Sequence, residues 1–437
     1  MNREPSLRQS LGLSHATAMV VGTIIGASIF VQPSEITRQM PSVAGIVGAW
    51  LAAGVLTLFG ALVCAELASA FPRTGGVYVF LTEAFSPAVG FLWGWAMFWS
   101  MHTGIIAAIA VVFARYAGHF YDFGDLGLRL VAVGVIIVLS AVNYVGVRHG
   151  GLVQNVFTAA KLVAIAALVV AGAVWSGAVA APAQTTAGAV TLNGFVLAIA
   201  AGLFAYGGWH MVTYTAGETK DAARTIPRAL VIGTLVVTVC YAGLNAIYLR
   251  VLPLDAVRAS TRVAADAADV LLGGGGGSAV AILVMVSTFG AVNGIILTGP
   301  RVYYSMAESG TLFGWVGAVH PVYGTPYRAI ALQAIWASVL ALTNTYGMLF
   351  SRVVYTEWIF FAAMAVGLML LRRRPGYRPS YRVWAYPVVP ILFVAVSAVV
   401  VVVQILAVPG DSIIGLGMVL VGLPIYWLWS RPGRTRA

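Results

Sequence analysis

The chain has 437 residues, of which 60% are hydrophobic and 9% carry a charge. A soluble domain has roughly 25% charged residues, so a soluble fold of this size could not cover its surface. The apolar content excludes a disordered chain, and two cysteines are too few for a disulfide scaffold. The net charge is +11, but the basic residues lie between apolar runs rather than on one polar face, which argues against nucleic-acid binding. The composition indicates a polytopic membrane protein.

Twelve stretches are long enough for transmembrane helices, each of which needs about 20 apolar residues. The sequence predicts spans at residues 14–33, 44–66, 88–117, 127–146, 151–175, 194–216, 228–250, 279–304, 327–345, 349–371, 386–406 and 413–430. Arg3 and Arg8 precede the first stretch, but no cleavage site of small residues follows it, so we interpret it as an uncleaved span. The prediction is an all-α membrane protein with 12 transmembrane helices.

The basic residues predict the orientation. An even number of spans places both termini on one side of the membrane, and most of the 25 Lys and Arg residues then flank that side. The opposite side carries Arg38, Arg115, Arg129, Arg250, Arg258, Arg262 and Arg352. Because Lys and Arg are enriched in cytoplasmic loops, both termini are predicted to be cytoplasmic.

Two of the segments between predicted spans are long enough to contain structure of their own. Residues 71–87 are too polar and too short to cross the membrane, so we expect an interfacial segment at the inner face. Residues 252–278 contain the glycine run Gly273–Gly277. We expect a flexible connector there rather than a phosphate-binding loop, because no Lys-Ser/Thr pair follows the glycines.

Two spans contain glycines at mid-depth. The first has Gly22 and Gly26 within residues 21–30, and the sixth has the pair Gly207–Gly208 within residues 202–210. Each glycine costs a helix about 1 kcal/mol relative to alanine. Small residues in membrane helices also serve close packing, but breaks at corresponding places of two halves are typical of a binding site between inverted repeats. We therefore predict that the first and sixth spans are unwound.

Unwound helices in a bilayer need polar partners. Freed N–H and C=O groups cost several kcal/mol each unless they line a cavity that holds something polar. The N-terminal end of a half-helix attracts a carboxylate, and exposed carbonyls attract an ammonium. The pattern therefore predicts a receptor for a small zwitterion.

At these residues and others, the sequence resembles the amino acid–polyamine–organocation transporter superfamily. It is most similar to the L-type amino-acid transporter branch and bacterial exchangers of the serine/threonine type. The resemblance covers nearly the whole chain. The motifs that carry it are residues 21–33, 65–67, 71–78, 83–87, Lys161, and residues 204–209, 217–220 and 226–229.

The resemblance implies a fold of two inverted repeats of five spans each, at residues 1–175 and 194–371, followed by two trailing spans in residues 383–430. It implies sodium-independent exchange of neutral L-amino acids by alternating access in a bacterial inner membrane, with no cofactor and no metal. Animal members tether a heavy subunit through a cysteine, and residues 117–127 contain none, so no heavy subunit is expected.

Two other functions are compatible with the sequence. Proton-coupled uptake of cationic amino acids or amines is motivated by Glu357 and His210. A membrane amino-acid sensor would be expected to carry a soluble signalling domain. No nucleophile elbow or metal-binding spacing is present in the sequence, so an enzyme is not predicted.

The resemblance also implies which residues contact the substrate. The implied contacts are the amides of Gly26, Ala27 and Ser28 for the carboxylate, the carbonyls of Ile24, Phe204 and Gly207 for the ammonium, and the neighbouring Thr23. Phe204 would also be an aromatic gate. Trp358, in the tenth span, would be a wall of the side-chain pocket.

Three features depart from the family pattern. The first break reads Gly26-Ala27-Ser28, where Gly-Ser-Gly is usual, which leaves the substrate size open. His210 replaces a neutral amide and is either a structural hydrogen-bond partner or a substrate contact. Glu357 is a packing acid, a side-chain specificity residue or a proton carrier.

Lys161 lies near the middle of its span, too deep for its side chain to reach the interface easily. A charge there costs about 2.5–3.5 kcal/mol on insertion scales, so it needs partners. Our hypothesis is that its ammonium occupies the place where sodium-coupled relatives hold a cation. It would bond carbonyls at the first break and hydroxyls of the eighth span, such as Ser287 or Thr288. Substrate occupancy would then couple to closure without sodium.

Acidic residues cluster near the predicted inner ends of the spans. Glu66, Glu83 and Glu218 lie there with Arg73 and Arg224 nearby. We interpret these residues as ion pairs of an inner gate rather than as substrate contacts.

Overall fold

The computed structural model describes residues 9–175, 190–260, 262–273, 275–344 and 346–429. Within these residues the regular secondary structure is helical, apart from one isolated bridge between Leu11 and Thr219. Within them, eight helical segments are long and apolar enough to cross a membrane. They are α3 (Val43–Ala70), α5 with η1 and α6 (Pro87–Ala96, Met97–Met101 and His102–Ala117), α7 (Gly124–Val145), α8 (Val147–Trp175), α9 with η2 (Leu192–Ala205 and Trp209–Glu218), α10 (Ala222–Val251), α13 (Gly276–Glu308) and α16 (Val388–Ala407).

A further span is broken. Helices α1 (Leu13–Ile24) and α2 (Ser28–Gln39) together are apolar and long enough to cross, but they are bent by 42° at the break between them. Shorter apolar helical stretches follow near the end of the chain: α14 (Tyr327–Thr343), Thr356–Leu371 within α15 (Tyr346–Leu371), and Ser412–Leu428 across α17 (Pro409–Leu420) and α18 (Gly422–Trp429). The protein is therefore a multi-pass membrane protein.

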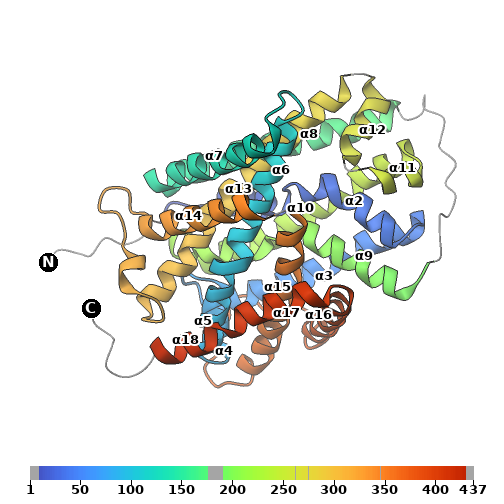
Figure 1. The fold of residues 1–437 in the computed structure, drawn as a ribbon. Helices are drawn as coiled ribbons and strands as arrows, with labels where there is room; N and C mark the ends of the chain where they lie inside the picture. Colours follow the sequence, from blue (N-terminus) through green and yellow to red (C-terminus); the bar gives the residue numbers. More distant parts are fainter. Residues whose placement is uncertain (1–8, 176–189, 261, 274, 345, 430–437) are drawn as a thin grey trace.

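Helix α13 occupies the interior of the bundle, where it packs against α1, α6 and α8. Figure 1 shows α2 at one end of the bundle, together with α11 (Leu254–Ala259) and α12 (Val263–Leu272), and α18 at the opposite end. Because α13 touches both halves of the chain, it can fix the first break relative to the sixth span.

The two long loops, residues 71–87 and 252–278, both contain short helices. Residues 71–87 contain the short helix α4 (Val77–Ala84), which packs against α5 and α15. The expected flexible connector is instead helical on both sides: α11 and α12 precede the glycine run, and Gly276 begins α13. The Gly277 N–H donates a hydrogen bond to Asp269 Oδ1 at 2.6 Å, which ties the two helices together. Gly274, Arg3 and Arg8 lie outside the described residues.

Candidate substrate site

The first break lies between Ile24 and Ser28. The last helical bond runs from the Ile25 N–H to the Val21 carbonyl at 2.9 Å. The Gly26 N–H then donates to the Ile24 carbonyl at 2.8 Å, which forms a tight turn instead of another helical turn. Helix α1 therefore ends with carbonyls that have no intrahelical donor, and α2 begins with amides that have no intrahelical acceptor.

The second break lies between Ala205 and Trp209. The Gly207 N–H donates to the Phe204 carbonyl at 2.9 Å, and Gly208 has a φ of +100°, a conformation that favours glycine. Beyond it the chain continues as the 3₁₀ helix η2. The Thr23 hydroxyl donates to the Gly208 carbonyl at 3.1 Å, so the two breaks are in direct contact.

A small cavity of about 30 Å³ lies at the two breaks. Space of this size holds no more than about two water molecules, so an amino acid enters only if the lining moves apart. Eight of the residues predicted from the sequence line the cavity: Thr23, Ile24, Gly26, Ser28, Phe204, Gly207, Glu357 and Trp358. The remaining lining residues are Ile105, Ile109, Leu203, Gly208, Trp209, Met211, Ile295 and Phe361. The structure thus brings the first, sixth and tenth predicted spans together around one space.

Two predicted substrate contacts do not line this cavity. Ala27 is fully buried at the break and can offer only its backbone. The His210 ring lies behind the cavity wall, with ring centroids 4.7 Å from Phe361 and 5.4 Å from Trp209. The 3₁₀ turn places Trp209 and Met211 at the cavity and His210 outside its lining, so a direct contact between His210 and the substrate stays a prediction.

The backbone groups at the cavity are not equally available. The Gly26 amide is used by Ile24, and the Ile24 carbonyl accepts that bond and a second one from the Tyr241 hydroxyl. The Phe204 carbonyl accepts the Gly207 N–H. In the described part of the chain, no backbone or side-chain donor bonds the Gly207 carbonyl. A substrate ammonium would therefore find its least occupied acceptor at Gly207.

Lys161 lies directly behind the first break and is completely buried. Its Nζ donates to the carbonyls of Gly22 at 3.1 Å, Ile25 at 2.6 Å and Ser287 at 3.0 Å. The carbonyl partners at the break agree with the hypothesis, but the predicted hydroxyl partners do not. The Ser287 hydroxyl donates to the Ile25 and Gly26 carbonyls, and the Thr288 hydroxyl bonds its own helix. Both hydroxyls are donors here because carbonyls surround them.

Tyr241 joins the two breaks and was not predicted from the sequence. Its hydroxyl, on α10, lies 3.1 Å from the Ile24 carbonyl and 2.8 Å from the Ala205 carbonyl, both of which can accept its proton. Tyr241 is fully buried, and its ring contacts Tyr206 and Trp50. A tyrosine in an apolar helix carries no sequence motif, so nothing in the pattern distinguished it.

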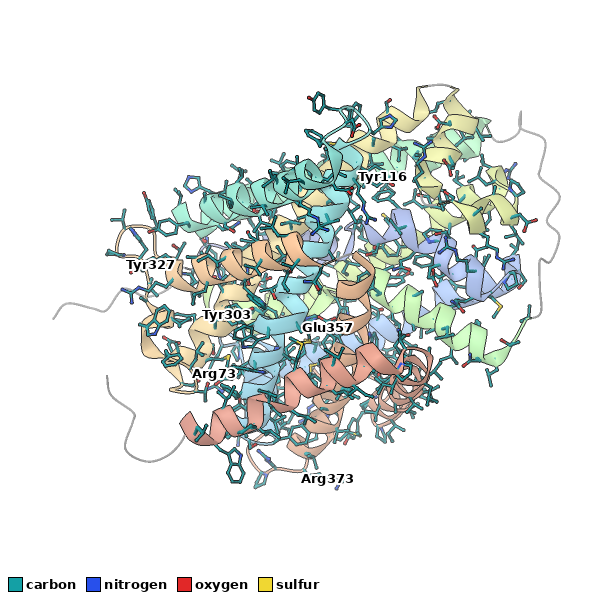
Figure 2. The ribbon with its side chains drawn as sticks, in the orientation of Figure 1. Arg73, Tyr116, Tyr303, Tyr327, Glu357 and Arg373 are labelled. Atoms are coloured by element: carbon teal, nitrogen blue, oxygen red, sulfur yellow. The ribbon has the colours of Figure 1, made fainter. Side chains whose placement is uncertain are left out.

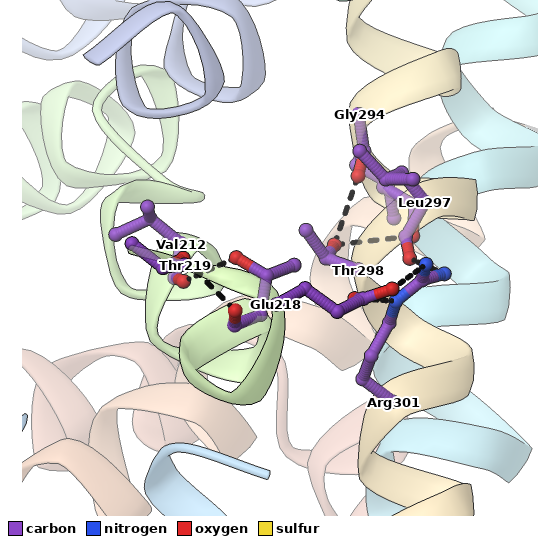
Figure 3. A network of polar contacts seen from close by, with 9 residues as sticks. Val212, Glu218, Thr219, Gly294, Leu297, Thr298 and Arg301 are labelled. Carbon is purple, nitrogen blue, oxygen red and sulfur yellow. Dashed lines mark hydrogen bonds and ion pairs between the residues drawn. The ribbon is translucent and has the colours of Figure 1, made fainter. Parts of the chain in front are cut away.

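A buried ion pair lies at the C-terminal end of η2, in the sixth predicted span. Arg301 of α13 donates two hydrogen bonds to the Glu218 carboxylate at 2.7 and 2.9 Å, and both side chains are 0% exposed (Figure 3). Arg301 also donates to the Leu297 carbonyl. The Glu218 carbonyl accepts the N–H groups of Ser10 and Leu11, which ties the segment before α1 to the same place. This arrangement holds α1, η2 and α13 together on one side of the cavity.

Other acidic residues of the predicted inner gate also form ion pairs. Glu66 accepts a hydrogen bond from Arg372 at 2.8 Å, and Glu83 pairs with Arg73 as predicted. Figure 2 shows Arg73 and Arg373 at separate places in the lower part of the bundle, with Arg373 at its edge. The prediction for Arg224 was wrong, because its nearest acidic group is the aspartate three residues earlier, at 4.0 Å.

The comparisons with known proteins agree with this geometry. The profile of the amino acid permease family matches residues 11–428. The chain is 32% identical over 433 residues to the serine/threonine exchanger SteT of Bacillus subtilis, covering 96% of this chain and 97% of that protein. It is 31% identical over 438 residues to the b(0,+)-type amino acid transporter 1 of Mus musculus, covering 97% and 88%. It is 30% identical over 439 residues to the large neutral amino acids transporter small subunit 2 of Oryctolagus cuniculus, covering 97% and 81%.

These matches span nearly the whole chain and confirm the resemblance drawn from the motifs. They also agree with the cavity at two helix breaks, because such breaks are typical of binding sites in secondary transporters. The chain belongs to the amino acid permease family and is a membrane transporter of amino acids, not an enzyme.

Proposed function

We propose that this protein exchanges neutral L-amino acids across a bacterial inner membrane without sodium. The observation that carries the proposal is the cavity at the two breaks, with the Lys161 ammonium bonded to carbonyls immediately behind it. The breaks place helix ends of opposite polarity around one space, and Lys161 supplies a fixed positive charge beside them. Exchange is supported by the similarity to the serine/threonine exchanger SteT.

The backbone ends of the two breaks bind the amino-acid part of the substrate in this proposal. The N-terminus of α2 points its amides and its positive dipole end at the carboxylate. The amides of Ala27 and Ser28 hold the carboxylate, because the Gly26 amide already bonds Ile24. The Gly207 carbonyl holds the ammonium.

The position of Lys161 supports the proposal that transport is independent of sodium. Its ammonium bonds three carbonyls, two of them at the first break, and an oxygen-lined position of this kind also suits a metal cation. Because Lys161 is covalently attached, its amine stays at this position in every state of the cycle. Closure around the substrate then requires no cation from solution.

Alternating access requires the cavity to open to each side in turn. Phe204 is the outer gate in this proposal, since it lines the cavity and is only partly buried. The Glu218–Arg301 pair is the inner gate, since it fixes η2 to α13. Opening to the inside would separate this pair and release the segment that begins with Leu11.

The proposed architecture has twelve spans, with inverted repeats at residues 1–175 and 194–371, trailing spans in residues 383–430, and both termini in the cytoplasm. The break of α1 and α2 and the break of α9 and η2, each in the first span of its half, support the repeat. We propose that the chain acts without a second subunit, because residues 117–127 contain no cysteine for a tether.

Counterflow in liposomes tests the function. Purified protein is reconstituted, and uptake of labelled serine or leucine is measured with and without internal unlabelled amino acid, in sodium and in choline buffers. The expected result is uptake that requires internal amino acid and is equal in the two buffers. Uptake into empty liposomes that follows an imposed pH gradient would reject exchange, and a requirement for sodium would reject the role given to Lys161.

A further inference from the structure

Glu357 lines the substrate cavity and has no hydrogen-bond partner for one of its carboxylate oxygens. It lies on α15, is 5% exposed, and its Oε1 is completely enclosed. Figure 2 shows it in the interior of the bundle. Every other residue that lines the cavity is uncharged, so Glu357 contributes the only ionisable side chain of the lining.

Among the side chains that the structure describes, which do not include that of Arg352, none brings a positive charge to Glu357. On η2, Tyr214 lies within electrostatic range and His210 lies behind the cavity wall. His102, on α6, lies beside His210, with their ring centroids 6.3 Å apart. On α13, Tyr303 adds a buried phenol, and both histidine rings are without hydrogen-bond partners. No ion pair among the described residues includes Glu357.

Three basic side chains elsewhere in the bundle already have hydrogen-bond or ion-pair partners. Lys161 bonds three carbonyls behind the first break, and Arg301 is held by Glu218. Arg372, which directly follows α15, is held by Glu66. The side chain of Arg352, on α15 itself, lies outside the part of the structure that is described. Among the described side chains, a charged Glu357 in a closed site therefore has no basic partner, and an uncompensated charge in a low-dielectric interior is strongly unfavourable.

A zwitterionic substrate does not remove this charge. Its carboxylate and its ammonium are both used at the two helix breaks, so they leave Glu357 uncompensated. Two species can neutralise it: a proton, or a cationic group on the substrate side chain. The aromatic rings of Trp209, Trp358 and Phe361 line the same cavity, and aromatic faces stabilise an ammonium or a guanidinium.

We propose that Glu357 must be neutralised before the site closes, so that a neutral amino acid is transported only with a proton on Glu357, whereas an amino acid with a cationic side chain is transported without one. The inference rests on the proposed function and extends its substrate class to basic amino acids. The proton is taken from the aqueous side from which the substrate enters and returns to water when the site opens. In exchange of two neutral amino acids, the proton travels in both directions and no net proton moves.

The test compares neutral and basic substrates at two pH values. Exchange of labelled serine and of labelled lysine is measured in liposomes with the same pH on both sides, at about 6 and about 9, values that bracket the range in which a perturbed carboxyl titrates. For the wild-type protein, serine exchange should fall by about tenfold or more at the higher pH, whereas lysine exchange should not fall. Parallel pH dependence of the two substrates would overturn the proposal.

The Glu357→Gln variant removes the charge and keeps the shape. Its serine exchange should be independent of pH, and its lysine exchange should be at least about tenfold weaker than that of the wild type. The control is Asp125→Asn, an exposed acid at the start of α7, which should behave as the wild type. Retention of the wild-type pH profile and of lysine exchange by Glu357→Gln would overturn the proposal.

Two further results keep the test decisive. If Glu357→Gln is poorly folded, the comparison of serine and lysine with the wild-type protein still decides the question. If His210→Gln or His102→Gln abolishes the pH dependence and Glu357→Gln does not, a histidine is the titrating group and the proposal is wrong. Failure of the proposed function is distinct, because then the wild-type protein would show no counterflow with any amino acid at either pH.

Discussion

Replacing Lys161 by methionine keeps the length of the side chain and removes its ammonium. The Gly22 carbonyl would then lose its donor, because the N–H that would normally bond it, that of Gly26, bonds Ile24 instead. An orphaned buried carbonyl costs about 1–3 kcal/mol. The Ile25 carbonyl keeps the Ser287 hydroxyl and loses roughly 0.5 kcal/mol net, as does the Ser287 carbonyl within its helix.

The total of about 2–4 kcal/mol corresponds to roughly 30- to 1,000-fold weaker closure around the substrate. The assay is counterflow of labelled amino acid at equal amounts of reconstituted protein. The chain has two lysines, so Lys220→Met is a matched control, since Lys220 is exposed and should tolerate the change. Exchange by Lys161→Met within about twofold of the wild type would refute the reasoning, because that difference is below about 0.5 kcal/mol.

Three further substitutions follow from the same contacts. Tyr241→Phe removes the hydroxyl between the two breaks and should reduce exchange roughly fivefold, for about 1 kcal/mol, without loss of folding; unchanged exchange would contradict the link. Gly208→Ala should abolish exchange and lower the unfolding temperature, since its φ is +100° and its Cβ would lie 2.9 Å from a carbonyl oxygen of α1; a fully active variant would exclude the tight contact. Glu218→Gln leaves Arg301 without its charge partner and should lower the free energy of unfolding by about 3–5 kcal/mol, whereas Glu83→Gln, at an exposed pair, should cost about 1 kcal/mol or less; equal thermal shifts would contradict this ranking.

The sequence predicted both breaks because glycines concentrate where the helices end. Gly22 and Gly26 flank the turn after Ile24, and Gly207 and Gly208 form the turn after Ala205. The predicted length of the first span was less accurate than the predicted position of its break. The prediction ended it at residue 33, whereas α2 continues to Gln39, because the polar residues of its outer half fall below the hydropathy expected of a span.

The partners of individual side chains could not be predicted, because they depend on helix rotation and register. The position of Lys161 in its span indicated that it needs acceptors, but not that the Ser287 carbonyl would be one of them. The segment Trp209–Glu218 is a 3₁₀ helix, and His210 lies outside the cavity lining. The sequence predicted only a helical span there, which did not determine whether the His210 side chain faces the cavity. Arg301 is not among the arginines predicted for the outer side, so the charge pattern placed it at the cytoplasmic ends of the spans; its burial against Glu218 depends on the packing of α13 against η2, which the sequence does not show.

The most direct test of the account is an experimental structure of the protein reconstituted in lipid with a bound amino acid, by electron cryo-microscopy. The account predicts the carboxylate at the amides of Ala27 and Ser28, the ammonium at the Gly207 carbonyl, and Lys161 still bonded behind the first break. An amino acid bound elsewhere, or a first span that runs as one unbroken helix past Gly26, would contradict it.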